Sequence, residues 1–188
     1  MLQASGATMV DCCGRRVAAH FGSPASEATV CLRTVGMADR WDRVTLELRG
    51  EPMGVEECLD GLGHTAWSAR VSDVRALVRC ERADEPACLR VLAHAEDVSR
   101  LDVSSAVAAI QLIGPRAWRL LDAGHLADGV VVLEAPDRYE VLTAAGDAAV
   151  VWRRLLEAGR PHGLACVGLE ALGHLTASGR LGRRTRSG

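Results

Sequence analysis

The most reactive residues of this sequence do not form a known catalytic motif. Six histidines lie far apart, at positions 20, 64, 94, 125, 162 and 174. His94 has two acidic residues close by, Glu96 and Asp97, but neighbouring residues on a strand or turn point in different directions. The patterns of dinucleotide-binding, P-loop, zinc-protease and serine-hydrolase sites are missing. We therefore predict no metal site, and general motifs leave the catalytic residues unknown.

The spacing of the cysteines and the absence of lysine argue against further kinds of catalytic and metal-binding site. The seven cysteines, at positions 12, 13, 31, 58, 80, 88 and 166, include no Cys-x-x-Cys pair and no zinc-type spacing. Reduced, mostly buried thiols of a cytoplasmic protein are the simplest interpretation. The adjacent pair Cys12 and Cys13 is the one place where a reactive thiol is considered. All 22 basic residues are arginine, so no lysine can form a Schiff base or bind a phosphate.

The composition indicates one globular domain. The chain has 188 residues, of which 48% are hydrophobic and 24% charged. A net charge of −2 and an aromatic content of 3% give neither the positive field nor the stacking surface of a nucleic-acid-binding protein. Residues 1–10 lack the features of a secretory leader, and no apolar stretch reaches the roughly 18 residues of a membrane helix. We expect a cytoplasmic protein without nucleic-acid or membrane partners.

Helices are predicted from capping residues and apolar spacing. One begins at Ser23-Pro24, and Gly36 is expected to end it. The clearest covers residues 147–158, with Asp147 as its cap and Trp152 paired four residues apart with Leu156. Two shorter helices are expected over residues 55–62 and 114–124. We expect Trp118 and Trp152 to lie in the core.

Strands are predicted over residues 44–48, 67–71, 74–80, 88–93, 107–113, 130–134 and 139–142. The first alternates apolar and polar residues, which predicts a half-buried strand, whereas 107–113 is apolar on both faces and therefore central. Segments 46–62 and 110–126 repeat one order of strand, glycine turn and helix. We predict an α+β fold of two similar α/β subunits with mainly antiparallel sheets. A flexible leader (1–14) and a flexible Arg-rich tail (179–188) are expected to flank a domain at 15–178.

Four segments, in order, resemble the glycine-cleavage T-protein (aminomethyltransferase) and its folate-binding relatives. They are HFGSPASEATVCLRTVGMADRWDRVTLELRG (20–50), LDVSSAVAAIQLIGPRAWRLLDA (101–123), DRYEVLTAAGDAAVVWRRLLEAG (137–159) and GLACVGLEALGHL (163–175). The resemblance implies that residues 15–178 form the T-protein-like folate-binding domain, with tetrahydrofolate as a possible cofactor. It also implies a short, diverged member without the family's C-terminal barrel.

The departures from the family pattern concern its catalytic and pterin-facing residues. The family has a Gly-Gly-x-x-Asp-Asp segment, but residues 65–80 contain Asp73 as their only acid. The family's Gly-Glu-Asp-Gly is replaced by Ala135-Pro136-Asp137-Arg138. A positioned acid–base group contributes about 10²–10⁴ in rate, so loss of the aspartate predicts poor aminomethyl transfer. Whether the protein is an enzyme at all is left open, and a pseudoenzyme is one candidate.

The resemblance assigns five residues to a possible ligand site. Asp39 lies in the best-matched segment and is either a site residue or a cap of the glycine turn. Tyr139 and Glu140 match a pocket-lining hairpin, and the alternative is a core tyrosine beside a solvent-exposed glutamate. Trp67 and Arg70 lie where the family's folate loop runs, which implies stacking on a pterin and pairing with the glutamate tail of folate.

Two functions of different class follow. The first is binding of tetrahydrofolate or a similar small molecule, in one-carbon transfer or in a recruited biosynthetic reaction. The second is a non-catalytic subunit that holds a larger partner through protein–protein contacts, as the small subunit of multi-chain sarcosine oxidase does in the same family.

Overall fold

The computed structural model describes residues 6–181, apart from residues 13, 64, 96, 123–125, 127, 128 and 136. The chain divides into two compact units. Of the described residues, 6–41 and 108–181 form unit 1, and 42–107 form unit 2. The middle of the chain therefore builds one unit, and the segments before and after it build the other. Within the described residues, no helix is both long enough and apolar enough to span a membrane.

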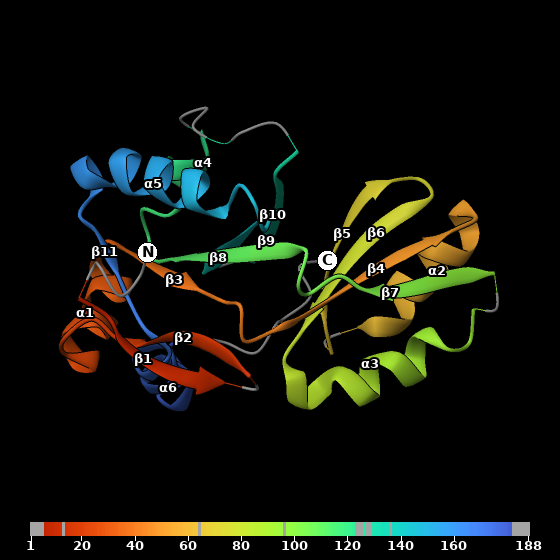
Figure 1. The fold of residues 1–188 in the computed structure, drawn as a ribbon, viewed down its shortest axis with the longest axis horizontal. Helices are drawn as coiled ribbons and strands as arrows, with labels where there is room; N and C mark the ends of the chain where they lie inside the picture. The colour runs from red at the N-terminus through yellow and green to blue at the C-terminus, as the bar shows by residue number, and fades with distance from the viewer. Residues whose placement is uncertain are drawn as a thin grey trace. The chain divides into compact units, whose positions relative to one another are not determined.

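Unit 1 contains two sheets (Figure 1). In the smaller sheet, β1 (Thr8–Cys12) pairs antiparallel with β2 (Arg15–His20). The larger sheet has five strands in the order β11 (Leu164–Cys166), β3 (Val35–Asp39), β8 (Val107–Ile113), β10 (Arg138–Ala144) and β9 (Val131–Ala135). β11 runs parallel to β3, whereas the β3/β8 and β9/β10 pairs are antiparallel. The predicted central strand 107–113 is confirmed, because β8 is the middle strand and six of its seven residues are buried.

Helices cover both faces of the five-stranded sheet. α4 (Trp118–Asp122) and α5 (Ala148–Gly159) share a buried cluster with Leu112 of β8. α1 (Pro24–Arg33) and α6 (Leu169–Ala177) share another with the next residue of β8, Ile113. Because successive side chains of a strand point to opposite faces, the two pairs of helices lie on opposite sides of the sheet, as Figure 1 shows. The short 3₁₀ helix η3 (Arg160–His162) follows α5.

The start of α1 was predicted from its residues and is confirmed. The Ser23 hydroxyl accepts a hydrogen bond from the Ser26 amide, and Pro24 occupies the first turn. The buried Glu27 joins three segments, because its carboxylate accepts from the Phe21 amide at 2.7 Å and from the Gly168 amide at 2.8 Å. Gly36 does not end this helix, contrary to the prediction. It lies in β3, where an added Cβ would stand 2.3 Å from Cys31 Sγ.

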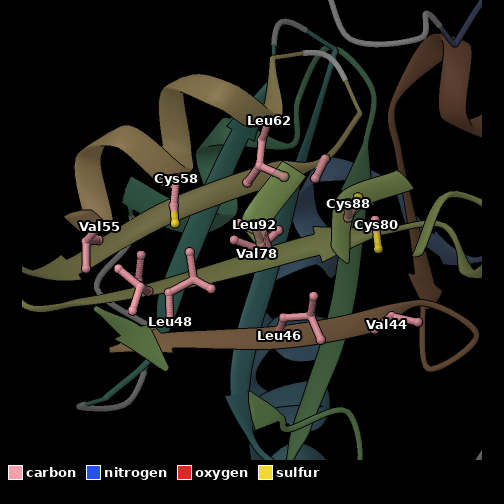
Figure 2. Close-up of a cluster of buried hydrophobic side chains, with 13 residues drawn as sticks. Val44, Leu46, Leu48, Val55, Cys58, Leu62, Val78, Cys80, Cys88 and Leu92 are labelled. Atoms are coloured by element: carbon pink, nitrogen blue, oxygen red, sulfur yellow. The ribbon is translucent and has the colours of Figure 1, made fainter. Parts of the chain in front are cut away.

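Unit 2 is a four-stranded antiparallel sheet covered by two helices. The strand order is β5 (Trp67–Ser72), β6 (Arg75–Cys80), β4 (Val44–Gly50) and β7 (Val98–Asp102). The helices are α2 (Pro52–Leu62) and α3 (Glu85–Leu92), with the 3₁₀ helix η2 (Arg82–Asp84) before α3. Figure 2 shows their apolar side chains meeting those of the sheet in one buried cluster that includes Leu46, Leu48 and Leu92.

One strand prediction in unit 2 is wrong, and a second is right about the strand but wrong about its burial. Residues 88–93 were predicted as a strand, but residues 85–92 form α3, whose buried Cys88 and Leu92 are four residues apart on one helix face. Residues an even number of positions apart also lie on one face of a strand, so the same pair fits a strand equally well. The strand at residues 44–48 is present, but it is buried on both faces rather than one.

The two ends of the chain are more ordered than expected where the structure describes them. Residues 8–12, assigned to a flexible leader, form β1. Leu181 is buried, although it falls in the expected tail 179–188. Residues 1–5 and 182–188 lie outside the described residues. Trp118, expected in the core, is 46% exposed, and the guanidinium of Arg119 lies 4.7 Å from its ring centre.

Candidate functional site

Unit 1 contains a cavity of about 360 Å³ beside the first turn of α5. Such a volume lies within the range of small-molecule sites. Its polar wall residues are Arg16 of β2 and Asp39 at the end of β3. The other wall residues are Met9, Trp41, Ile110, Trp152 and the alanines 108, 109, 145, 148 and 149. The cavity is therefore an apolar space with a few polar groups, which is the usual composition of a ligand pocket.

Asp39 is the only one of the five predicted site residues that lines this cavity. Its carboxylate accepts a hydrogen bond from the Trp41 amide at 3.1 Å. The guanidinium of Arg15 lies 5.2 Å from the centre of the Trp41 ring, within the range of a cation–π contact. Asp39 thus caps the turn after β3 and also lines the cavity, and its role as a ligand-site residue stays a prediction.

Trp152 lines the cavity and also carries a buried hydrogen-bond donor that is unsatisfied. Its side chain was expected in the core, and the residue is only 4% exposed. The buried indole Nε1 nevertheless has no hydrogen-bond partner within the described part of the chain. Because a buried donor without a partner costs roughly 1–3 kcal/mol, such a group needs an explanation. The spacing of residues 148–156 predicts a helix, but it does not reveal whether the Trp152 indole has a hydrogen-bond partner. The apolar pattern is the same in both cases.

Arg16 is a second cavity residue that the sequence analysis missed. It is exposed, and no carboxylate of the described residues lies within 4 Å of its guanidinium. Asp11, which faces it across the β1/β2 hairpin, accepts a hydrogen bond from the Gly14 amide. The arginine lies just inside the predicted domain, after the expected leader 1–14, and no motif there singles it out.

The first turn of α5 also borders the cavity. Ala148 and Ala149 line the cavity, and the first amides of a helix have no partner within the helix. Asp147 was predicted to cap this helix with its side chain, but that side chain makes no capping hydrogen bond. Its backbone carbonyl instead accepts from the Val151 amide at 3.0 Å. The positive end of the α5 dipole therefore faces the cavity without a side-chain cap.

Tyr139 and Glu140 lie on opposite faces of β10. Glu140 is fully buried, so the alternative of a solvent-exposed glutamate is wrong. It accepts from Gln111 Nε2 at 3.4 Å, and Gln111 Oε1 accepts from Arg40 Nη1 at 3.0 Å. Glu140 thus belongs to a buried polar row across the sheet. Such a row stabilises the fold only while all its members are satisfied.

Tyr139 packs at the edge of the cluster around α5 and lies opposite Glu134 in the β9/β10 hairpin. Burial raises the pKa of its phenol, and the charge and hydrogen bonding of Glu134 raise it further. The tyrosine therefore stays protonated at neutral pH and is not prepared to act as a base.

The remaining two predicted residues, Trp67 and Arg70, belong to β5 of unit 2. The guanidinium of Arg43 lies 5.1 Å from the centre of the Trp67 ring, and Arg43 also binds the carboxylate of Glu81. Arg70 lies 3.7 Å from a carboxylate oxygen of Glu56. Both residues thus have partners within unit 2. The predicted stacking on a pterin and pairing with a folate tail stay untested.

No cluster of three or more histidine, cysteine or acidic side chains suited to a metal occurs among the described residues. His64, Glu96, Cys13 and His125 lie outside them. Of the adjacent thiol pair considered from the sequence, Cys12 is half-buried in β1. Burial raises the pKa of the Cys31 and Cys166 thiols, to about 12 and about 11, with a smaller contribution from Glu27. These two thiols are therefore unreactive.

Comparisons with known proteins support the fold and not a family. No protein-family model matches the chain, and no curated protein matches its sequence. Among solved structures, the aminomethyltransferase T of the glycine cleavage system from Bartonella henselae matches with a TM-score of 0.66 and 16% identity, over 90% of this chain and 58% of that one. The chain therefore spans a little over half the length of that relative.

A chain of the heterotetrameric sarcosine oxidase from Corynebacterium sp. U-96, solved in complex with pyrrole 2-carboxylate, matches with a TM-score of 0.53 and 16% identity. The match covers 76% of this chain and 93% of that one. The regulatory subunit of aspartate kinase from Thermus thermophilus reaches a TM-score of only 0.45 over 65% of this chain. The structure thus has an α+β, T-protein-like fold with mostly antiparallel sheets.

Proposed function

We propose that this protein binds a small molecule in the cavity of unit 1, with tetrahydrofolate as the first candidate ligand. The observation that carries the proposal is the cavity itself, an apolar space of about 360 Å³ with Asp39 and Arg16 at its wall. The choice of tetrahydrofolate rests on the resemblance of four segments to the T-protein family. The likeness of the fold to an aminomethyltransferase supports it only at the level of the fold.

Binding without efficient aminomethyl transfer is the expected behaviour. The segment that supplies the family's aspartate has here only Asp73, which is exposed. Glu140 is held in a buried row, and burial raises the pKa of the Tyr139 phenol. Since a positioned acid–base group is worth about 10²–10⁴ in rate, any transfer would depend on ligand orientation.

Calorimetric titration with tetrahydrofolate and 5-formyltetrahydrofolate tests the proposal. The informative variant is Ala149→Phe, because Ala149 lines the cavity and a phenyl ring there would fill part of it. The matched control is Val150→Phe, the next residue of the same helix, which is 43% exposed and does not line the cavity. We expect binding to be lost in Ala149→Phe and kept in Val150→Phe. Absence of heat with the unmodified protein at high micromolar ligand would sink the folate assignment.

A second candidate is a non-catalytic subunit of a multi-chain oxidase. It is favoured by the match to a chain of a heterotetrameric enzyme, of which 93% is covered. Purification of the native, untagged protein from its host, followed by size-exclusion chromatography, separates the two candidates. Elution with larger chains in fixed proportion supports the subunit function, and elution alone argues against it.

A further inference from the structure

We propose that Cys80 and Cys88 of unit 2 form a two-thiol redox site, which a peroxide converts into an intramolecular disulfide. The proposal does not depend on the proposed function, because it concerns residues of unit 2 and not the cavity of unit 1. It follows from the contact between the two thiols, from the difference between their surroundings and from the short helix that carries one of them.

The two thiols come from different elements and lie in contact. Cys80 is the last residue of β6, Cys88 lies on the buried face of α3, and both are free thiols. Figure 2 shows their side chains next to each other in the buried cluster of unit 2, and a hydrogen bond joins the two thiol groups. Contact is the first requirement for a disulfide, because its S–S bond is only about 2 Å long. The sequence analysis missed this pair, since it predicted residues 88–93 as a strand.

The hydrogen bond makes the two thiols unequal. It raises the pKa of the Cys80 thiol, which burial raises further, and it lowers the pKa of the Cys88 thiol against the opposing effect of burial. As a thiol, Cys88 also donates to the Thr65 carbonyl over a long distance of 3.8 Å, and ionisation releases this weak contact. Because the thiolate is the form that reacts with oxidants, we assign Cys88 as the residue that is oxidised first and Cys80 as the resolving thiol.

The access of an oxidant depends on α3. Cys80 is 3% exposed and Cys88 is fully buried, so neither thiol reacts while the helix is closed. However, α3 has only eight residues, of which Cys88 and Leu92 are buried. An element with so few buried side chains opens at a lower free energy than the whole fold. We therefore expect slow oxidation through local opening of α3, and closing of the helix returns the oxidised Cys88 to Cys80.

The reaction takes two steps. The Cys88 thiolate attacks one oxygen of the peroxide, so that an S–O bond forms, the O–O bond breaks, and the leaving hydroxide takes up the proton of the thiol as water. The Cys80 sulfur then attacks the sulfur of the Cys88 sulfenic acid, so that the S–S bond forms, the S–O bond breaks and a second water leaves. The two thiols together lose two electrons, and hydrogen peroxide gains them. A dithiol reductant restores both thiols by thiol–disulfide exchange.

Peptide mapping of the full chain by mass spectrometry tests the proposal. The protein is treated with hydrogen peroxide, and its remaining thiols are blocked with iodoacetamide in urea before digestion. Trypsin cleaves after the arginines at positions 79, 82 and 90, which places the two cysteines on separate peptides, 80–82 and 83–90. We expect these two peptides to be cross-linked after oxidation and to separate after treatment with dithiothreitol. The closed loop should also raise the midpoint of thermal unfolding by roughly 5 °C.

Three variants separate the roles of the two thiols. Cys80→Ala should abolish the cross-link and leave the Cys88 sulfenic acid free to react with dimedone, because no resolving thiol is present. Cys88→Ala should abolish both the cross-link and the dimedone adduct. The matched control is Cys58→Ala, which removes a thiol that is buried in the same cluster but has no thiol partner among the described residues. This control should keep the cross-link at unchanged yield.

The sulfoxide of Met53, a residue that is 84% exposed, reports in the same map that the peroxide has acted. Absence of the cross-link between peptides 80–82 and 83–90 once Met53 is oxidised would overturn the proposal. A cross-link of Cys88 to Cys58 instead of Cys80 would overturn it as well. The mapping of the original chain needs no substitution, so it decides the outcome even where a variant does not fold.

Discussion

The two units of this protein differ in the surroundings of one tryptophan and one arginine each. In unit 2, Arg43 binds Glu81 and lies over Trp67. In unit 1, Trp152 and Arg16 line a cavity, and within the described part of the chain the buried Trp152 indole Nε1 has no hydrogen-bond partner and Arg16 has no ion-pair partner. The arginine and the tryptophan of unit 2 contact each other, whereas those of unit 1 border the space that we propose as a ligand site.

This difference separates stability from binding. Polar groups that satisfy each other contribute to folding, whereas groups without partners reduce stability until something binds them. We therefore expect substitutions in unit 2 to change the free energy of unfolding and substitutions at the unit 1 cavity to change ligand affinity.

The largest expected effect is in the core of unit 2. Leu48 is fully buried in β4 (Figure 2), and Leu48→Ala should lower the free energy of unfolding by about 2–5 kcal/mol. Affinity for tetrahydrofolate, measured on the folded protein, should stay within about twofold of the original. Urea denaturation and calorimetry on the same preparation check both. A large loss of affinity in a variant that is still folded would break the comparison.

A smaller effect is expected at Glu47, which is buried in β4 and binds Arg49 and Arg75. Burial alone would raise the pKa of this carboxyl, but its hydrogen bonds and charge pairing with the two arginines outweigh burial and lower it. Because the arginines are largely exposed, Glu47→Gln should cost only about 1–2 kcal/mol.

The lowered pKa of Glu47 also fixes a pH dependence. The folded state binds this proton less readily than the unfolded state, in which the glutamate has a pKa of about 4.3. The contribution of the carboxylate is therefore fully present above that pH and is lost as the pH falls through the folded pKa. The stability difference between the original protein and Glu47→Gln should be constant from about pH 8 to pH 5 and shrink below about pH 4. Glu57→Gln, at an exposed position of α2, is the control variant and is measured over the same pH range.

The smallest effects come from a matched pair of arginines. Arg43→Gln in unit 2 removes a partly exposed pair with Glu81 and the contact with Trp67, and should lower the free energy of unfolding by about 1 kcal/mol. Arg16→Gln in unit 1 should change it by less than about 0.5 kcal/mol, as is usual for an exposed side chain without partners. Thermal denaturation of both variants without ligand measures the difference. Equal losses of stability would mean that Arg16 is a structural residue.

The sequence predicted most elements of the fold and little of the site. Ser23-Pro24 and the hairpin segments 130–134 and 139–142 have local signals, and α1, β9 and β10 confirm them. α3 was predicted as a strand, because Cys88 and Leu92 fit both periods. Gly36 was read as a helix end, although its real role is a close approach to Cys31 that only the tertiary structure reveals.

The site depended on contacts between segments that are far apart in the sequence. Asp39 was found because its segment resembles a known family, and it does line the cavity. Arg16 and Trp152 come from β2 and α5, and no local pattern distinguishes an arginine or a tryptophan that has a partner from one that lacks it. Glu140 was taken for a site or surface residue because nothing in its own segment reveals Gln111 and Arg40 as partners.

The most direct test of the central claim is a nuclear magnetic resonance titration of the tryptophan indole N–H signals with tetrahydrofolate. The chain has four tryptophans, at positions 41, 67, 118 and 152, of which Trp41 and Trp152 line the cavity. Binding in the cavity predicts that the signals of Trp41 and Trp152 shift and that those of Trp67 and Trp118 stay in place. Signals of Trp41 and Trp152 that stay fixed while the ligand binds, or that move no more than those of Trp67 and Trp118, would contradict the account.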